Sequence, residues 1–136
     1  MDESRLKTVP LFAGLSTAEL QRLSSVTDEI VVPAGTRLID EGRYSHEFLL
    51  IEHGSADVRR AGELIAQLGP GDFAGEIGVM QDARRNASVV ASTRLAAIVM
   101  TARDLRHVTE EMPTVAAQID VAIAARSATL GRAKPD

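Results

Sequence analysis

The sequence contains no cysteine and no tryptophan, and only 3% of its residues are aromatic. Without cysteine the chain forms no disulfides and offers no thiolate ligands to a metal. So few aromatic rings also disfavour a surface that stacks nucleic-acid bases. The histidines, His46, His53 and His107, lack the spacing of metal ligands, so we expect no metal site.

The chain also lacks an excess of positive charge and any long apolar run. Its net charge is -4, whereas a nucleic-acid-binding domain is usually basic, so we expect no direct binding to nucleic acid. The longest apolar run, residues 95–100, is too short to span a bilayer, and the charged N-terminus does not resemble a signal peptide. These features predict a cytoplasmic protein of one domain.

Local patterns predict helices at both ends and strands between them. Ser16 and Glu19 have the spacing of a capping box, which predicts a helix from Thr17 to Ser25. Thr101 is a predicted N-cap, and Pro113 suits the first turn of a final helix that continues to about Leu130. Short runs rich in valine, isoleucine, leucine and phenylalanine predict strands at 30–32, 36–39, 47–52, 56–60, 63–68, 87–92 and 95–100.

This order of elements predicts an α+β fold. We expect an antiparallel β-roll (a double-stranded β-helix or jelly roll) with a short N-terminal helix and C-terminal helices. The expected domain covers residues 9–130, with flexible termini at 1–8 and 131–136. Phe12, Phe48 and Phe73 are expected in its core rather than on a stacking surface.

Residues 71–91 carry the chemistry of a small-anion site. Gly75 allows a ligand to approach the backbone closely, and a helical turn from Glu76 to Met80 would direct free N–H groups toward an anion. Arg85 offers a guanidinium fork that matches two phosphate oxygens, and the Glu76 carboxylate can accept a hydrogen bond from a hydroxyl. The segment therefore predicts a site for a phosphate-bearing sugar.

The same segment resembles the phosphate-binding cassette of cyclic nucleotide-binding domains. The matching stretches are Phe73-Ala74-Gly75-Glu76-Ile77-Gly78-Val79 and Arg85-Asn86-Ala87-Ser88-Val89-Val90-Ala91. The resemblance extends from about Val9 to Leu130. It implies that Glu76 binds the ribose 2′-hydroxyl and that Arg85 binds the exocyclic phosphate oxygens.

Further roles follow from the resemblance alone. The backbone N–H groups of Ile77 and Ala87 would complete the phosphate cradle. Val58, Ile65 and Leu68 would form the wall around the sugar and base. The whole candidate set for the cyclic nucleotide is Val58, Ile65, Leu68, Gly75, Glu76, Ile77, Arg85, Asn86, Ala87 and Ser88.

Two positions depart from the family pattern. Arg84 stands where many members have proline, and Asn86 stands where alanine, serine or threonine is usual. In the family the latter position helps to distinguish guanine from adenine, so the base preference stays open, with cyclic AMP favoured over cyclic GMP.

The resemblance implies a regulatory, non-enzymatic domain that signals through its C-terminal helix. Small residues at Ala116, Ala122 and Ala125 would allow a second helix to approach closely in a dimer seam. The helix could also act as a lid over the base, or simply fold back on the roll and bury Ile119 and Ile123. The main alternative is a degenerate domain that mediates protein interaction without binding nucleotide. A cupin-like metalloenzyme and a DNA-binding regulator are disfavoured, because a histidine–carboxylate cluster and a basic helix-turn-helix are missing from the sequence.

Overall fold

The computed structural model describes residues 2–39, 47–75 and 87–121. Its N-terminal part holds the helices α1 (Glu3–Leu6), η1 (Pro10–Phe12) and α2 (Thr17–Ser24). At the start of α2, the Ser16 hydroxyl accepts a hydrogen bond from the Glu19 N–H at 3.1 Å, and the Glu19 carboxylate accepts one from the Ser16 N–H at 2.9 Å. This reciprocal pair confirms the predicted capping box.

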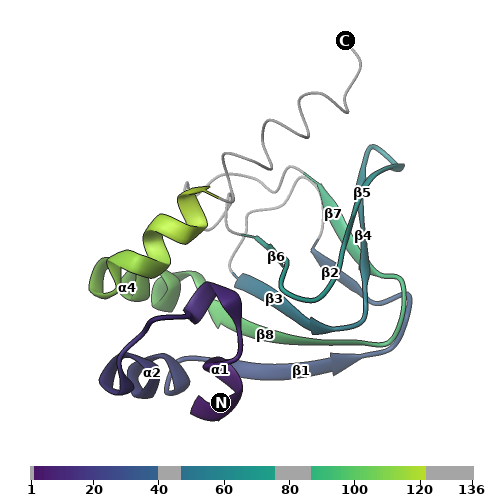
Figure 1. Ribbon diagram of the computed structural model, residues 1–136. Coiled ribbons are helices and arrows are strands. Elements are labelled where there is room, and N and C mark those ends of the chain that lie inside the picture. The colour runs from purple at the N-terminus through teal and green to yellow at the C-terminus, as the bar shows by residue number, and fades with distance from the viewer. Residues whose placement is uncertain (1, 40–46, 76–86, 122–136) are drawn as a thin grey trace.

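The described residues form two four-stranded antiparallel sheets (Figure 1). The helix-side sheet has the order β1-β8-β3-β6 and the far sheet the order β2-β7-β4-β5. The strands are β1 (Asp28–Val32), β2 (Arg37–Ile39), β3 (Glu47–His53), β4 (Ala56–Arg60), β5 (Glu63–Leu68), β6 (Phe73–Ala74), β7 (Ser88–Ala91) and β8 (Leu95–Thr101). After them come α4 (Ala102–Glu111), capped by Thr101 as predicted, and a last helix described over residues 113–121. The β-roll with flanking helices is confirmed.

The helix-side sheet is the middle layer of the fold. Figure 1 shows α1, α2 and α4 gathered beside β1, β3 and β8, while the β4–β5 hairpin lies at the other end. In β3, Phe48 and Leu50 pack toward the helices, whereas Leu49 and Ile51 pack between the sheets. Successive side chains of a strand point to opposite faces, so a strand covered on both faces is apolar throughout.

Two apolar cores result from this layering. The helix core contains Leu6, Val9, Leu11, Phe12, Leu20, Leu23, Phe48, Leu50, Phe73, Ile98, Met100, Leu105, Val108, Met112, Val115 and Ile119. The roll core, between the sheets, contains Ile39, Leu49, Ile51, Ala56, Val58, Leu68, Ala74, Ala87, Val89, Ala91, Leu95 and Ala97. The expected core positions of the three phenylalanines are confirmed, and all three lie in the helix core.

Residues 2–8, within the N-terminal segment that the sequence analysis expects to be flexible, contain the short helix α1. Asp2 caps α1 by accepting a hydrogen bond from the Ser4 N–H at 2.9 Å, and Leu6 is fully buried in the helix core. Burial of one leucine side chain contributes roughly 1.5–3 kcal/mol, which favours the packing of α1 against the helix core.

Strand β6 was not predicted either, because a two-residue strand leaves no periodic signal. The expected end of the last helix near Leu130 and the expected flexible tail, 131–136, lie outside the described residues. None of the helices in the described ranges is long and apolar enough to cross a membrane.

Candidate functional site

The two ends of the predicted cassette lie in different sheets. The chain leaves the helix-side sheet after β6 and joins the far sheet at β7. Gly75, directly after β6, has a φ of 91°, a conformation that side chains with a Cβ rarely adopt. Ala87, directly before β7, is buried. Glu76, Ile77, Arg85 and Asn86 fall between them and lie outside the described residues.

Strand β6, which forms the start of the cassette, contacts both cores. Phe73 pairs with Leu50 and belongs to the helix core, whereas its neighbour Ala74 pairs with Leu49 and belongs to the roll core. Both side chains are 5% exposed. A displacement of Gly75 would therefore act on both layers of the fold through two consecutive residues.

The structure brings the candidate wall residues together on the far sheet. Val58 of β4 pairs with Val89 of β7 on one side and with Ala66 of β5 on the other. Val58 and Leu68 are roll-core residues, as is Ala87 at the end of the cassette. Ser88 pairs with Arg59 in the neighbouring strand, one position along from Val58. Val58, Leu68 and Ala87, together with the partly buried Ile65, thus face the roll core, whereas Ser88 precedes the inward-facing Val89 and lies on the other face of its strand.

An irregularity in β5 places Ile65 in this wall. The pairing runs Val58 with Ala66 and then Arg59 with Leu64, so Ile65 is the extra residue of a β-bulge. Such a bulge changes the direction of neighbouring side chains. As a result Ile65 and Ala66 both pack against the roll core, while Leu64 is left 47% exposed.

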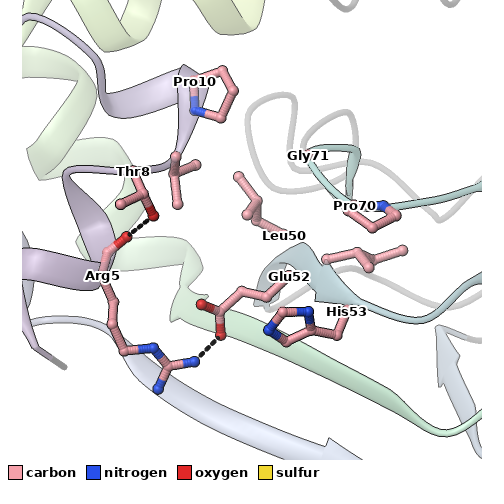
Figure 2. Close-up of a pocket in the computed structure, with 10 residues that line it drawn as sticks. Arg5, Thr8, Pro10, Leu50, Glu52, His53, Pro70 and Gly71 are labelled. Atoms are coloured by element: carbon pink, nitrogen blue, oxygen red, sulfur yellow. Dashed lines mark hydrogen bonds and ion pairs between the residues drawn. The ribbon is translucent and has the colours of Figure 1, made fainter.

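The sequence analysis missed a charged cluster, which consists of Arg5, Glu29 and Glu52. One guanidinium nitrogen of Arg5 contacts carboxylate oxygens of Glu29 in β1 and Glu52 in β3, at 2.7 Å for Glu52. These residues are far apart in sequence, and the only signal was an acidic residue, Glu52, directly after the apolar run 48–51. Arg5 and Glu52 line a cavity of about 350 Å³. Figure 2 shows the hydrogen bond between their side chains.

Two pKa shifts accompany this charged group. Burial is the largest cause that raises the pKa of Glu52, and the neighbouring Glu29 carboxyl raises it further. The hydrogen bond from Arg5 is the main cause that lowers the pKa of Glu29. Within the described part of the chain, no group of three or more histidine, cysteine or acidic residues is arranged to hold a metal ion.

The β-roll fold and the cassette sequence are both typical of cyclic nucleotide-binding domains, and the comparison with known families agrees. The sequence model of the cyclic nucleotide-binding domain matches residues 29–112, which is more than half of the chain. The chain belongs to the cyclic nucleotide-binding domain family.

Two relatives are regulatory subunits of cAMP-dependent protein kinase. The subunit from Yarrowia lipolytica is 37% identical over 97 residues, which are 70% of this chain and 26% of that protein. The subunit from Schizosaccharomyces pombe is 35% identical over 94 residues, 68% of this chain and 23% of that protein. The chain thus spans about a quarter of the length of these curated relatives.

Solved structures share the fold. The catabolite activator protein of Thermus thermophilus is 26% identical and has a TM-score of 0.75. The match covers 86% of this chain and 57% of the Thermus chain. A cAMP-bound PfPKA-R has a TM-score of 0.86 at 16% identity, with 98% of this chain and 46% of that one covered. The regulatory subunit of a cAMP-independent protein kinase A from Trypanosoma brucei has a TM-score of 0.76 at 24% identity, and the match covers 90% of this chain and 44% of that one.

Proposed function

We infer that this chain is a regulatory domain that binds cyclic AMP, within a unit spanning residues 9–130. Glu76 binds the ribose 2′-hydroxyl and Arg85 the exocyclic phosphate oxygens, while the N–H groups of Ile77 and Ala87 complete the phosphate cradle. The observation that carries this proposal is the cassette sequence in a chain of this family, 37% identical to a cAMP-dependent kinase regulatory subunit.

The geometry of the described flanks supports this assignment. Gly75 and Ala87 bring the two ends of the cassette to opposite sheets of the roll. Val58, Ile65 and Leu68 provide an apolar wall on the far sheet, suited to a sugar and a base. An anion in a protein with a net charge of -4 needs a local partner, which Arg85 supplies.

The C-terminal helix is the proposed output. Val115 and Ile119 of that helix are almost fully buried in the helix core, which also contains Phe73 of β6. Nucleotide capture would shift Gly75 and Phe73, and the helix would then favour a different packing. A ligand can shift this equilibrium only by its differential affinity for the two states. A second copy or an effector protein would read the new position of the helix.

A degenerate interaction domain is the second candidate. The observation that favours it is that the same fold occurs in the regulatory subunit of a protein kinase A described as cAMP-independent. The fold therefore leaves the ligand open, and the cassette side chains Glu76 and Arg85 are the reason to prefer binding.

Thermal unfolding with nucleotide separates the two candidates. A ligand at 100 times its Kd stabilises the folded state by about 2.7 kcal/mol, so saturating cyclic AMP is expected to raise Tm clearly. Linear 5′-AMP is the matched control, and cyclic GMP measures base preference. An unchanged Tm with both cyclic nucleotides at millimolar concentration would favour the interaction domain.

Hydrogen exchange tests the output separately. With cyclic AMP bound, amide protection is expected to change in residues 113–121 as well as around Gly75. A change confined to the cassette would leave nucleotide binding intact but contradict signalling through the helix.

A further inference from the structure

A tight turn of residues 69–72 connects β5 to β6, immediately before the cassette stretch. Pro70 and Gly71 are its central residues, and Gly71 has a φ of 91°, as the third position of a type II turn requires. The Asp72 N–H donates to the Gly69 carbonyl at 3.0 Å, and the Gly69 N–H donates to the Asp72 carboxylate at 2.8 Å. The two ends of the turn are therefore joined by a reciprocal pair of hydrogen bonds.

Strand β3 also holds the main chain of this turn. The Ile51 N–H donates to the Asp72 carbonyl at 2.9 Å, and the Gly71 N–H donates to the Ile51 carbonyl at 2.8 Å. The pairing with β3 continues at the next residue, where Phe73 lies opposite Leu50. Asp72 is thus the residue at which the turn, the middle sheet and the cassette stretch meet.

The Asp72 carboxylate adds a side-chain contact to this junction, whereas the other three hydrogen bonds join main-chain atoms. A hydrogen bond that a carboxylate accepts is charge-assisted and roughly twice as strong as a neutral one. Between Asp72 and Gly75 lie only Phe73 and Ala74, which are both 5% exposed and both paired with β3. The orientation of the turn is therefore passed on to Gly75 with little conformational freedom.

We propose that Asp72 is a positioning residue for the cyclic nucleotide site, because its carboxylate closes the turn and fixes the direction in which the chain reaches Gly75. This inference rests on the proposed function, and it assigns to Asp72 an effect that acts through the main chain rather than by contact with the nucleotide. Preorganisation of a binding segment raises affinity, since less conformational freedom is lost when the ligand binds. Loss of the carboxylate therefore weakens nucleotide binding while the fold persists.

Calorimetric titration of the full chain with cyclic AMP tests the proposal on three variants. Asp72→Ala is expected to bind about three- to tenfold more weakly than the wild type. Asp72→Asn keeps an acceptor oxygen and should recover most of the affinity. Ser16→Ala is the matched control, because it removes a bond of the same kind in α2, a side-chain oxygen that accepts from a backbone N–H at 3.1 Å. It should bind like the wild type.

Equal affinity of Asp72→Ala and wild type, or an equal loss in Ser16→Ala, would overturn the role of Asp72. A loss in Asp72→Asn as large as in Asp72→Ala would overturn it as well, because position 72 would then act through its charge.

Amide hydrogen exchange without nucleotide separates failure of this proposal from failure of the proposed function. In Asp72→Ala the amides of Gly69 and Gly75 are expected to exchange faster than in the wild type, whereas those of α2 should not change. Absence of cyclic AMP binding by the wild type would contradict the proposed function, and with it the role of Asp72 in binding. Wild-type binding together with unchanged exchange at Gly75 would leave that function standing and overturn the positioning role alone.

Discussion

The Phe48 and Phe73 rings pack with their centroids 5.4 Å apart and their planes inclined by 37°. This pair joins β3 to the two-residue strand β6 on the helix side of the middle sheet. Because Phe73 is the first residue of the cassette stretch and Gly75 follows closely, the aromatic pair anchors the start of the cassette. Offset or tilted ring pairs contribute about 0.5–1.5 kcal/mol beyond their burial.

Truncation of this anchor is expected to destabilise the fold strongly. Phe73→Ala should lower the free energy of unfolding by about 3–5 kcal/mol, because it removes a buried ring and leaves a cavity. Leu64→Ala, at a side chain 47% exposed, is the control and should have a much smaller effect. Urea unfolding measures both, and similar losses for the two variants would contradict the anchoring role.

The turn between β3 and β4 depends on Gly54. A Cβ at this position would lie 2.3 Å from the Arg94 carbonyl oxygen, and its φ is +88°. Gly35 has nearly the same φ, +89°, but a Cβ there would meet nothing within 4 Å.

The two glycine-to-alanine variants therefore separate steric clash from backbone strain. Gly35→Ala should cost about 1–2 kcal/mol from the positive φ, and Gly54→Ala a further ~1–3 kcal/mol from the clash. Chemical denaturation measures the difference. Equal costs would show that the contact with Arg94 relaxes freely.

The two carboxylates that share Arg5 are expected to respond to pH in opposite directions. The folded-state pKa of Glu52 is raised from its ordinary value of 4.5, so its contribution to stability is present below that value and is lost as the pH rises. The pKa of Glu29 is lowered from the same value, so its contribution is present above 4.5 and is lost as the pH falls.

Glutamine substitutions make this difference measurable. Between pH 4.5 and neutral pH, Glu52→Gln should gain stability relative to the wild type, whereas Glu29→Gln should lose stability. Unfolding free energies recorded across this range provide the test. A loss for Glu52→Gln at neutral pH would mean that Arg5 compensates its charge completely.

The helix α2 depends on its cap. Ser16→Ala removes the hydroxyl that accepts from the Glu19 N–H and should cost about 1 kcal/mol. Thr17→Ala, at the next and exposed position, is the control and is expected to change stability by less than about 0.5 kcal/mol. Thermal unfolding distinguishes the two, and equal effects would argue against the capping role.

Features that rest on neighbouring residues were predictable from the sequence. The capping box joins Ser16 to Glu19, and the Thr101 cap accepts from the N–H of Asp104, so both depend on spacings of three residues. The alternation of inward- and outward-facing side chains in β3 was less clear from the sequence, because both faces of that strand are covered and its residues 48–51 are all apolar. The phosphate-binding role of Arg85 stays a prediction that rests on motif spacing.

Features that rest on distant partners were not predictable. Arg5 contacts Glu29 and Glu52, which lie 24 and 47 positions further along the chain, so no local sequence pattern predicted these contacts of the N-terminal helix. Ile65 was assigned to the wall through the family resemblance. The bulge that places it there depends on the register between β4 and β5, which a single strand sequence does not define.

Calorimetric titration with cyclic AMP tests the central claim most directly, with wild type, Arg85→Ala and Arg84→Ala compared under one condition. Removal of one partner of an enclosed charge pair costs about 2–5 kcal/mol, so Arg85→Ala should bind at least about thirtyfold more weakly. The neighbouring Arg84→Ala should bind within a few-fold of the wild type. No binding by the wild type at millimolar nucleotide, or equal losses in the two variants, would contradict the assignment of Arg85 to the phosphate.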